Sequence, residues 1–516
     1  MTSESEPRQA VVVGAGPAGL TAAYELLAKG GGKWRVTVLE ESREIGGISR
    51  TLVHNGRRFD IGPHRFFSKS DEVNALWEKL MPTQGAPARD DLLLGRSCTL
   101  KAGGPDPERE DRVMLRRHRL TRIYYLRHFF DYPISLRPAT FLALGLVRTW
   151  KAGWSYLRSM FFKRPERSLE DFYVNRFGKV LYSMFFENYT EKLWGIHPSR
   201  ISPEWGAQRV KGLSLRKALF NALFPNRGRR ETSLIEEFSY PKKGSGQFWE
   251  LLADEVGKMG GEIRLGAKVV GIRAHAGRIE SVTLASGETI ACDALFSSMP
   301  ISNLVPALGN APDEVASVAR QLPYRDLVTV GLLVDRLALE NNTGFSTAGK
   351  YIPDVWIYVQ EPSVRIGRLE IYNNFSPYML DDYREHVWIA AEYFCSEKDD
   401  FWSTSDEECT RRCVKELVQA GILDSDTPVL DSVVTRTPKA YPAYFGAYSH
   451  FETVRQWLDG YCNLYCIGRN GQHRYNNMDH SMMCGIVAAR ALLGFVDRST
   501  VWDVNTESDY HEQKAS

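Results

Sequence analysis

The hydrophobic pattern at the start of the chain predicts a β-α-β unit. Gln9–Val13 is a short apolar run that leads directly into a cluster of glycines. Leu20–Ala28 then places apolar side chains at helical spacing, and Arg35–Leu39 is a second strand-like run, rich in β-branched residues, that ends at Glu40. A strand, a helix and a second strand therefore follow one another directly, which indicates a parallel α/β sheet.

The rest of the chain changes between helical and strand-like patterns. A stretch from about Leu136 to Leu223 has helical spacing and many large aromatic residues. Repeated alternation of apolar and polar residues from Tyr324 to Glu392 predicts a mostly antiparallel sheet. Shorter patterns predict strands over Glu262–Ile272, Ala291–Ser297 and Leu464–Gly468 and helices over Gly246–Met259 and Asp479–Leu493.

Composition and charge narrow the class of protein. With 516 residues, of which 43% are hydrophobic and 25% charged, the chain has the composition of an ordinary globular enzyme of about two or three domains. The net charge of +2 gives no reason to expect a nucleic acid partner. The eight cysteines form no C-x-x-C pair and do not cluster with histidines. We therefore expect no metal site, and reduced thiols in a cytoplasmic protein.

No apolar run approaches the roughly 18–20 residues that a membrane-spanning helix needs. The richest candidate, Phe141–Phe162, is interrupted by Arg148, Lys151 and Arg158. Its aromatic and basic residues leave two interpretations open. The segment is either a helix packed on its own protein, which we favour, or a helix that lies on a membrane surface.

The glycine cluster has the spacing of a dinucleotide-binding turn. Gly14, Gly16 and Gly19 form the pattern G-x-G-x-x-G directly between the predicted strand and helix. The first glycine permits a tight turn, the second lets the backbone approach a pyrophosphate, and the third lets the helix pack closely on the strand. The helix N-terminus offers N–H groups and a positive dipole end to the phosphates. Glu40 then ends the second strand, where a carboxylate can bind a ribose diol.

The sequence after Glu40 resembles the extended dinucleotide motif of the glutathione-reductase-like flavoproteins, in the branch that holds amine oxidases and protoporphyrinogen oxidases. The resemblance rests on a second glycine pair, on the strand that begins near Val269, and on Gly468-Arg469 before the last helix. It implies FAD as the cofactor. The residues expected to contact FAD are Gly14, Gly16, Pro17, Ala18, Gly19, Glu40, Glu41, Gly46, Gly47, Ile48, Ser49, Pro63, His64, Val269, Gly468, Arg469, Asn477, Met478 and Asp479.

The same resemblance implies an α/β fold with a Rossmann-like FAD-binding domain assembled from discontinuous segments. We expect this domain to comprise residues 8–82, 240–300 and 460–495. A mostly helical substrate region is expected over 120–235, and an antiparallel-sheet substrate domain over 301–459. Residues 83–118 are predicted to form an irregular insertion, and 496–516 a polar tail.

A narrower resemblance, to the UDP-galactopyranose mutases, covers nearly the whole chain. Several short motifs occur in the same order as in that family. They are Gly62-Pro63-His64-Arg65-Phe66, Asp131-Tyr132-Pro133-Ile134, Tyr189-Thr190-Glu191-Lys192-Leu193-Trp194, Leu213-Ser214-Leu215-Arg216, and Arg474-Tyr475-Asn476-Asn477-Met478-Asp479.

The mutase resemblance implies an enzyme that uses N5 of reduced FAD to interconvert the pyranose and furanose rings of a nucleotide sugar, without net oxidation. NADH or NADPH is the candidate reductant. Such a reaction needs cations beside a diphosphate, and guanidinium groups suit phosphate geometry. We therefore expect catalytic roles for Arg216, Arg469 and His64. The residues expected to bind the substrate are Trp194, Tyr189, Arg436 and Tyr475.

Two departures from the mutase pattern keep an alternative open. Gln472-His473 stands where a phosphate-binding tyrosine is expected, and Ala440–Tyr444 resembles the oxidase relatives more closely. The alternative is an oxidoreductase that takes hydride from a C–H or C–N bond of a larger substrate. Such an enzyme needs an apolar tunnel, which the aromatic stretch that contains Trp150, Trp154 and Phe162 could form. A flavoprotein that only scaffolds or senses redox state is a third interpretation.

Overall fold

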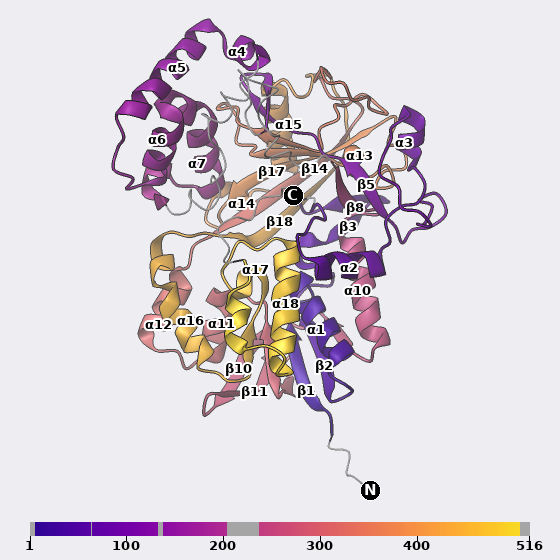
Figure 1. Cartoon of the computed structure of the whole chain (residues 1–516), viewed down its shortest axis with the longest axis vertical. Coiled ribbons are helices and arrows are strands. Elements are labelled where there is room, and N and C mark those ends of the chain that lie inside the picture. Colours follow the sequence, from indigo (N-terminus) through magenta and orange to yellow (C-terminus); the bar gives the residue numbers. More distant parts are fainter. Residues whose placement is uncertain (1–5, 63, 133–137, 204–236, 506–516) are drawn as a thin grey trace.

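The computed structural model of the chain describes residues 6–62, 64–132, 138–203 and 237–505. Two lobes lie one above the other in Figure 1, with a helical region on one side of the upper lobe. The expected α/β class, with segments distant in sequence brought into one domain, is confirmed.

A parallel five-stranded sheet organises the lower lobe. Its order is β19-β13-β1-β2-β9, so the first, middle and last parts of the chain lie side by side. Successive residues of β1 face two different cores: Ala10 and Val12 point to one side and Val11 and Val13 to the other. Strands buried on both faces are typical of parallel sheets. The strands are β1 (Arg8–Val13), β2 (Trp34–Glu40), β9 (Glu262–Leu265), β13 (Ala294–Ser297) and β19 (Leu464–Cys466).

Helices cover one face of this sheet, and a small antiparallel sheet with further helices covers the other. The first group contains α1 (Pro17–Lys29), α2 (Asp71–Leu80), α10 (Gly246–Lys258), α17 (Gly468–Gly471) and α18 (Met478–Leu492). The second group contains β10 (Val269–His275), β11 (Arg278–Leu284), β12 (Thr289–Ala291), α11 (Ile301–Leu308), α12 (Asp313–Gln321) and α16 (Phe451–Asp459).

The upper lobe is built on a seven-stranded, mainly antiparallel sheet of order β18-β14-β17-β16-β15-β6-β7, in which β15 and β6 pair in parallel. Helix α15 (Asp406–Gln419) packs its buried Cys409, Cys413 and Leu417 against one face. The strands are β6 (Thr121–Tyr125), β7 (His128–Asp131), β14 (Tyr324–Val334), β15 (Trp356–Val359), β16 (Arg368–Ile371), β17 (Val387–Cys395) and β18 (Val429–Pro442).

The helical region comprises α4 (Pro138–Leu144), α5 (Leu146–Phe161), α6 (Leu169–Tyr182) and α7 (Asn188–Trp194). Helix α6 is kinked at Gly178, whose φ of 78° is left-handed, and a π turn joins it to α7. None of the helices in the described ranges is long and apolar enough to cross a membrane.

The remaining described elements are short. Strands β3 (Thr51–His54) and β4 (Arg57–Asp60) form a hairpin, and β5 (Met114–His118) pairs with β8 (Glu237–Pro241). The other short helices are α3 (Arg89–Leu94), α13 (Tyr372–Phe375), α14 (Asp400–Ser403) and the helical turns Gly47–Ser49, Pro198–Arg200, Gly446–His450 and Arg498–Trp502.

Several boundaries differ from the sequence-based expectation. Strands β6 and β7, whose residues were assigned to the helical region, belong to the large sheet. Tyr124 packs in the core of that sheet, while Ile123 and Phe130 pack against Phe185 of the helical region. Residues 262–272, whose alternation predicts β structure, form two strands in different sheets, separated at Gly266, which has a φ of 68°. The start of the predicted tail is packed, because Val501 and Trp502 are buried against the lower lobe. Residues 301–321 and 451–459 likewise pack on that lobe.

Candidate cofactor and active site

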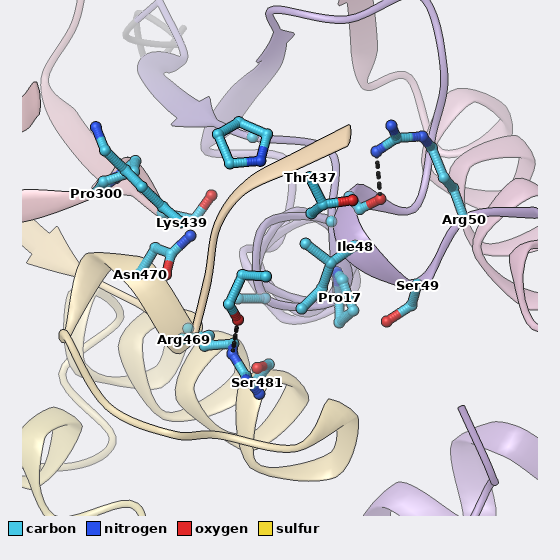
Figure 2. Close-up of a pocket in the computed structure, with 18 of the residues that line it drawn as sticks. Pro17, Ile48, Ser49, Arg50, Pro300, Thr437, Lys439, Arg469, Asn470 and Ser481 are labelled. Carbon is cyan, nitrogen blue, oxygen red and sulfur yellow. Dashed lines mark hydrogen bonds between the residues drawn. The ribbon is translucent and has the colours of Figure 1, made fainter. Parts of the chain in front are cut away.

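One cavity of about 960 Å³ runs between the two lobes. Its walls come from the glycine turn, the segment after β2, the loop before β10, and strands β16 to β18 of the upper lobe. Figure 2 shows Pro17, Ile48 and Ser49 on one side and Pro300, Lys439 and Asn470 on the other. A space of this size and length suits a dinucleotide with room left at one end.

The glycine turn closes tightly between β1 and α1. Gly14 has a φ of 102°, and its N–H donates to the carbonyl of Leu39 at 2.8 Å. A Cβ on Gly19 would lie 1.9 Å from the carbonyl oxygen of Gly14, so only glycine permits this approach of helix and turn. A Cβ on Gly16 would have its nearest neighbour at 3.7 Å, in Gly47. Gly16 is therefore free of internal crowding, and its surface faces the cavity.

Glu40 fastens the turn from the end of β2. Its carboxylate accepts hydrogen bonds from the backbone N–H of Ala15 at 2.8 Å and of Ser42 at 3.0 Å. The second glycine pair lies against the first, since the N–H of Gly46 donates to the carbonyl of Ala15 at 2.9 Å. Gly46 and Gly47 have φ values of 106° and 57°, which glycine adopts readily.

Most residues expected to contact FAD line this one cavity, although they come from distant parts of the chain. The lining includes Gly14, Gly16, Pro17, Ala18, Glu40, Glu41, Gly47, Ile48, Ser49, His64, Val269, Gly468, Arg469, Asn477, Met478 and Asp479. Gly19 and Gly46 support the wall from behind. Pro63 lies outside the described residues. The cradle at Gly16, the carboxylate of Glu40 and the N-terminus of α1 fit an adenine dinucleotide.

His64 also lines the cavity. Burial, with the nearby charges of Arg469 and Arg368, lowers the pKa of its imidazole to about 4, against an opposing hydrogen bond with the backbone of Gly62. The ring is therefore neutral near neutral pH. A neutral imidazole can donate or accept a hydrogen bond in the cavity without adding charge.

Arg469 is held rigidly in the same wall. Its Nε donates to the carbonyl of Ala440 at 2.8 Å, and Nη1 donates to the carbonyl of Asn476 at 3.0 Å. Its guanidinium also lies over the ring of Tyr475, 4.0 Å from the centroid. Within the described ranges no carboxylate forms an ion pair with Arg469, so its charge is available to the cavity.

Sequence reasoning missed the second arginine of this wall, Arg368. It forms a buried ion pair with Glu392, directly opposite on β17, and donates to the hydroxyl of Tyr441. Glu370 lies two residues further along β16, fully buried, with no hydrogen-bond partner for either carboxyl oxygen in the described part of the chain. Burial and the charge of Glu392 raise the pKa of Glu370 well above its ordinary value. The strand sequences carried a signal, because each places a charged residue inside an otherwise apolar, buried run.

The cavity lining also contains further basic side chains that the sequence analysis does not predict as site residues. Arg50 donates to the carbonyl of Gly47 at 2.9 Å, beside the glycine turn (Figure 2). Lys439 bonds Asn303 at 2.6 Å, and burial lowers the pKa of its ammonium group. Arg65 and Lys268 complete the set.

Several predicted substrate residues lie elsewhere or are otherwise engaged. Tyr475 lines the cavity. Trp194 is buried and Tyr189 partly buried on α7, where they pack edge-on against Phe445 and Tyr358, and neither belongs to the cavity lining. Arg436 touches the cavity, but its guanidinium binds Asp406 and the carbonyls of Trp402 and Thr404. Arg216 lies outside the described residues.

The residues that depart from the mutase pattern are structural. Gln472 donates to the carbonyls of Cys466 and Val501, and His473 bonds the carbonyl of Ala443 at 3.1 Å. Both side chains are buried and neither lines the cavity. Burial lowers the pKa of His473 to about 4.

Comparison with solved structures identifies similar folds over the full length. The chain resembles reduced UDP-galactopyranose mutase with a TM-score of 0.77 and 21% identity, over 97% of each chain. It resembles a putative protoporphyrinogen oxidase from Exiguobacterium sp. 255-15 with a TM-score of 0.66 and 18% identity, over 95% of this chain and 99% of that one. At these identities the likeness shows a shared fold.

Matches to curated proteins are short. The L-amino-acid oxidase of Crotalus adamanteus is 44% identical over 69 residues, which is 13% of each chain. A phytoene desaturase (neurosporene-forming) of Cereibacter sphaeroides is 44% identical over 59 residues, 11% of each chain. The match therefore spans only 13% of the length of the first relative.

A family match extends much further. Residues 17–460 match the flavin containing amine oxidoreductases. That range includes helix α1 after the glycine turn, most of the cavity wall and the whole upper-lobe sheet. The chain belongs to the flavin containing amine oxidoreductase family, and this membership implies FAD as its cofactor.

Proposed function

We propose that the protein is an FAD-dependent mutase that changes the ring size of a nucleotide sugar. The observation that carries the proposal is the position of Arg368 and Arg469 against one ring, that of Tyr441. The guanidinium carbons lie 5.7 Å and 5.1 Å from the ring centroid. Both charges also act on His64 at the same end of the cavity.

The guanidinium group of Arg469, beside the ion-paired Arg368, suits a diphosphate. Guanidinium groups bind phosphate oxygens through paired N–H donors, and a partly enclosed site strengthens these contacts. Glu392 neutralises Arg368, which leaves Arg469 as the cation for the substrate. A net positive charge of this kind would hold a nucleoside diphosphate when its bond to the sugar is broken.

The chemical step depends on the cofactor, because reduced FAD offers a nucleophilic nitrogen to the anomeric carbon. The protein's own residues would position the substrate and stabilise the diphosphate. Arg469 would hold the diphosphate, and the neutral imidazole of His64 would exchange hydrogen bonds near the flavin without competing for the anionic group. The rings of Tyr441 and Tyr475 stack with their centroids 5.8 Å apart, and they would form a flat aromatic wall beside Arg469.

An oxidoreductase acting on a C–H or C–N bond is the second candidate. The family match favours it, and so does the neutralisation of Arg368 by Glu392, which reduces the cationic character of the wall. The aromatic stretch offers it little support. Trp150, Trp154 and Phe162 are exposed on the outer side of the helical region and are not part of the cavity lining.

A panel of nucleotide sugars tests the proposal. The FAD-loaded protein is reduced with dithionite, incubated with each compound, and the products are separated by chromatography. We expect one compound to be converted to its ring isomer by the reduced protein. Absence of binding and of isomerisation across the panel would favour the oxidoreductase.

A further inference from the structure

A continuous apolar surface lies on the outer side of α5. Its large side chains recur every three or four residues and so share one helical face. Leu146 is 89% exposed, Trp150 70% and Phe161 78%, although side chains of this size are usually covered. We call this surface the outer face of α5; it consists of Leu146, Val147, Trp150, Trp154, Leu157 and Phe161.

The helix is anchored from its other side. Ala152 and Ser159 are buried, and α5 packs against α6. Figure 1 shows α5 along the outer edge of the molecule, with α6 between it and α7. The rings of Trp150 and Trp154 stack with an interplanar angle of 6° and centroids 6.4 Å apart. The outer face is therefore a formed surface on a folded helix.

The charge around this face has one sign. From Pro138 to Pro165 the sequence contains five basic residues and no acidic residue. Lys151 and Arg158, both exposed, each follow a residue of the outer face and so lie about 100° further round the axis. They border the apolar stripe, while Arg148, Lys163 and Arg164 add positive charge nearby.

The apolar stripe and its basic border together indicate which kind of partner covers the outer face of α5. A second copy of the chain would bring two like-charged borders together, which disfavours self-association. At 16 residues, α5 spans about 24 Å, which is less than the roughly 30 Å of a bilayer core. An apolar stripe with tryptophans and a basic border matches the interface of a membrane, where rings reach the acyl boundary and cations meet anionic head groups.

We infer that the outer face of α5 docks the protein on the surface of an anionic phospholipid bilayer. The helix lies in the interface plane, with Trp150 and Trp154 inserted and with Lys151 and Arg158 at the level of the head groups. This inference is independent of the proposed reaction, because none of these residues lines the cavity.

Vesicle flotation tests the inference with the FAD-loaded full chain. The vesicles are phosphatidylcholine alone, or phosphatidylcholine with about a third phosphatidylglycerol, a composition that supplies the negative surface potential. We expect wild type to float with the anionic vesicles and at least about tenfold less with the neutral ones. The double variants W150Q/W154Q and K151E/R158E should each lower partition about tenfold or more, with unchanged flavin absorbance.

Phe495 provides the matched control, because it is 60% exposed but lies outside the helical region. F495Q should float as wild type does. Equal flotation of wild type and both double variants would overturn the inference. It would also be overturned if sedimentation showed a dimer that W150Q/W154Q abolishes, in a protein that binds no vesicles.

Discussion

Arg469 lies over the aromatic face of Tyr475, with its guanidinium carbon 4.0 Å from the ring centroid. Two backbone carbonyls, of Ala440 and Asn476, fix the same group from the side. The cation is thus oriented before any ligand arrives, which reduces the entropy lost when an anion binds. Arg436 provides a contrast, because its guanidinium is already occupied by Asp406 and two carbonyls.

This contrast predicts different effects of the same substitution. R469K should weaken binding of uridine diphosphate by about 1.5–3 kcal/mol, roughly ten- to a hundredfold, because lysine loses the planar contact geometry. R436K should change the dissociation constant less than about threefold. Isothermal titration calorimetry of the FAD-loaded proteins measures both. Similar losses in the two variants would contradict the assignment of Arg469.

Replacement of each of the two buried glutamates near Arg368 by glutamine should affect the stability of the protein differently. E392Q leaves the buried charge of Arg368 without its partner, which costs about 3–5 kcal/mol. Burial and the charge of Glu392 raise the pKa of Glu370 and so favour its neutral form, which glutamine mimics; E370Q should therefore cost less than about 1 kcal/mol. Thermal unfolding followed by circular dichroism should therefore show a drop of several degrees for E392Q only. The reverse order would show that Glu370 carries the charge.

Two glycines of the same turn should separate folding from cofactor binding. G19A brings a Cβ within 1.9 Å of a backbone oxygen, so α1 must move, and we expect both apoprotein stability and FAD retention to fall. G16A meets no internal atom closer than 3.7 Å. Its methyl group instead occupies space needed by the pyrophosphate, and it should weaken FAD binding at least about tenfold with the apoprotein melting temperature unchanged. A loss of apoprotein stability in G16A would argue against this division of roles.

His473 predicts a pH-dependent contribution to stability. Its folded pKa of about 4 lies below the ordinary value of about 6.5. Between these values the unfolded chain binds a proton that the folded chain does not, so the contribution is complete above about pH 6.5 and falls by up to about 3 kcal/mol towards pH 4. H473N, which tolerates the φ of 45°, should be less stable than wild type near neutral pH, with a deficit that shrinks on acidification. Melting temperatures that differ by a constant amount across this range would contradict the prediction.

The glycine-turn side of the cavity lining is accessible to prediction from the sequence, because its determinants are local. Gly14, Gly16 and Gly19 act through backbone geometry that a short spacing specifies, and Glu40 follows at the end of the next strand. Val269 is distant in sequence and is predicted only from the resemblance to a family; it lines the same cavity.

The part of the cavity wall that holds Arg368 is harder to predict because its residues meet only through tertiary structure. Arg368 and Glu392 are far apart in sequence and pair through the register of β16 with β17. Tyr189 and Trp194 belong to a recognisable motif, but the packing of α7 places both outside the cavity lining of the described residues. The exposed side of α5 is a similar case, since periodicity shows that a helix is amphipathic without showing which face its own protein covers.

Counting turnovers per flavin under anaerobic conditions distinguishes a mutase from an oxidoreductase. The reduced, FAD-loaded protein is mixed with an excess of a nucleotide sugar that it binds, and the flavin spectrum and products are followed together. A mutase converts many substrate molecules to the ring isomer while the flavin stays reduced, and the oxidised protein is inactive. Product that appears only with the oxidised protein, in an amount no greater than that of the flavin, would contradict the account and identify an oxidoreductase.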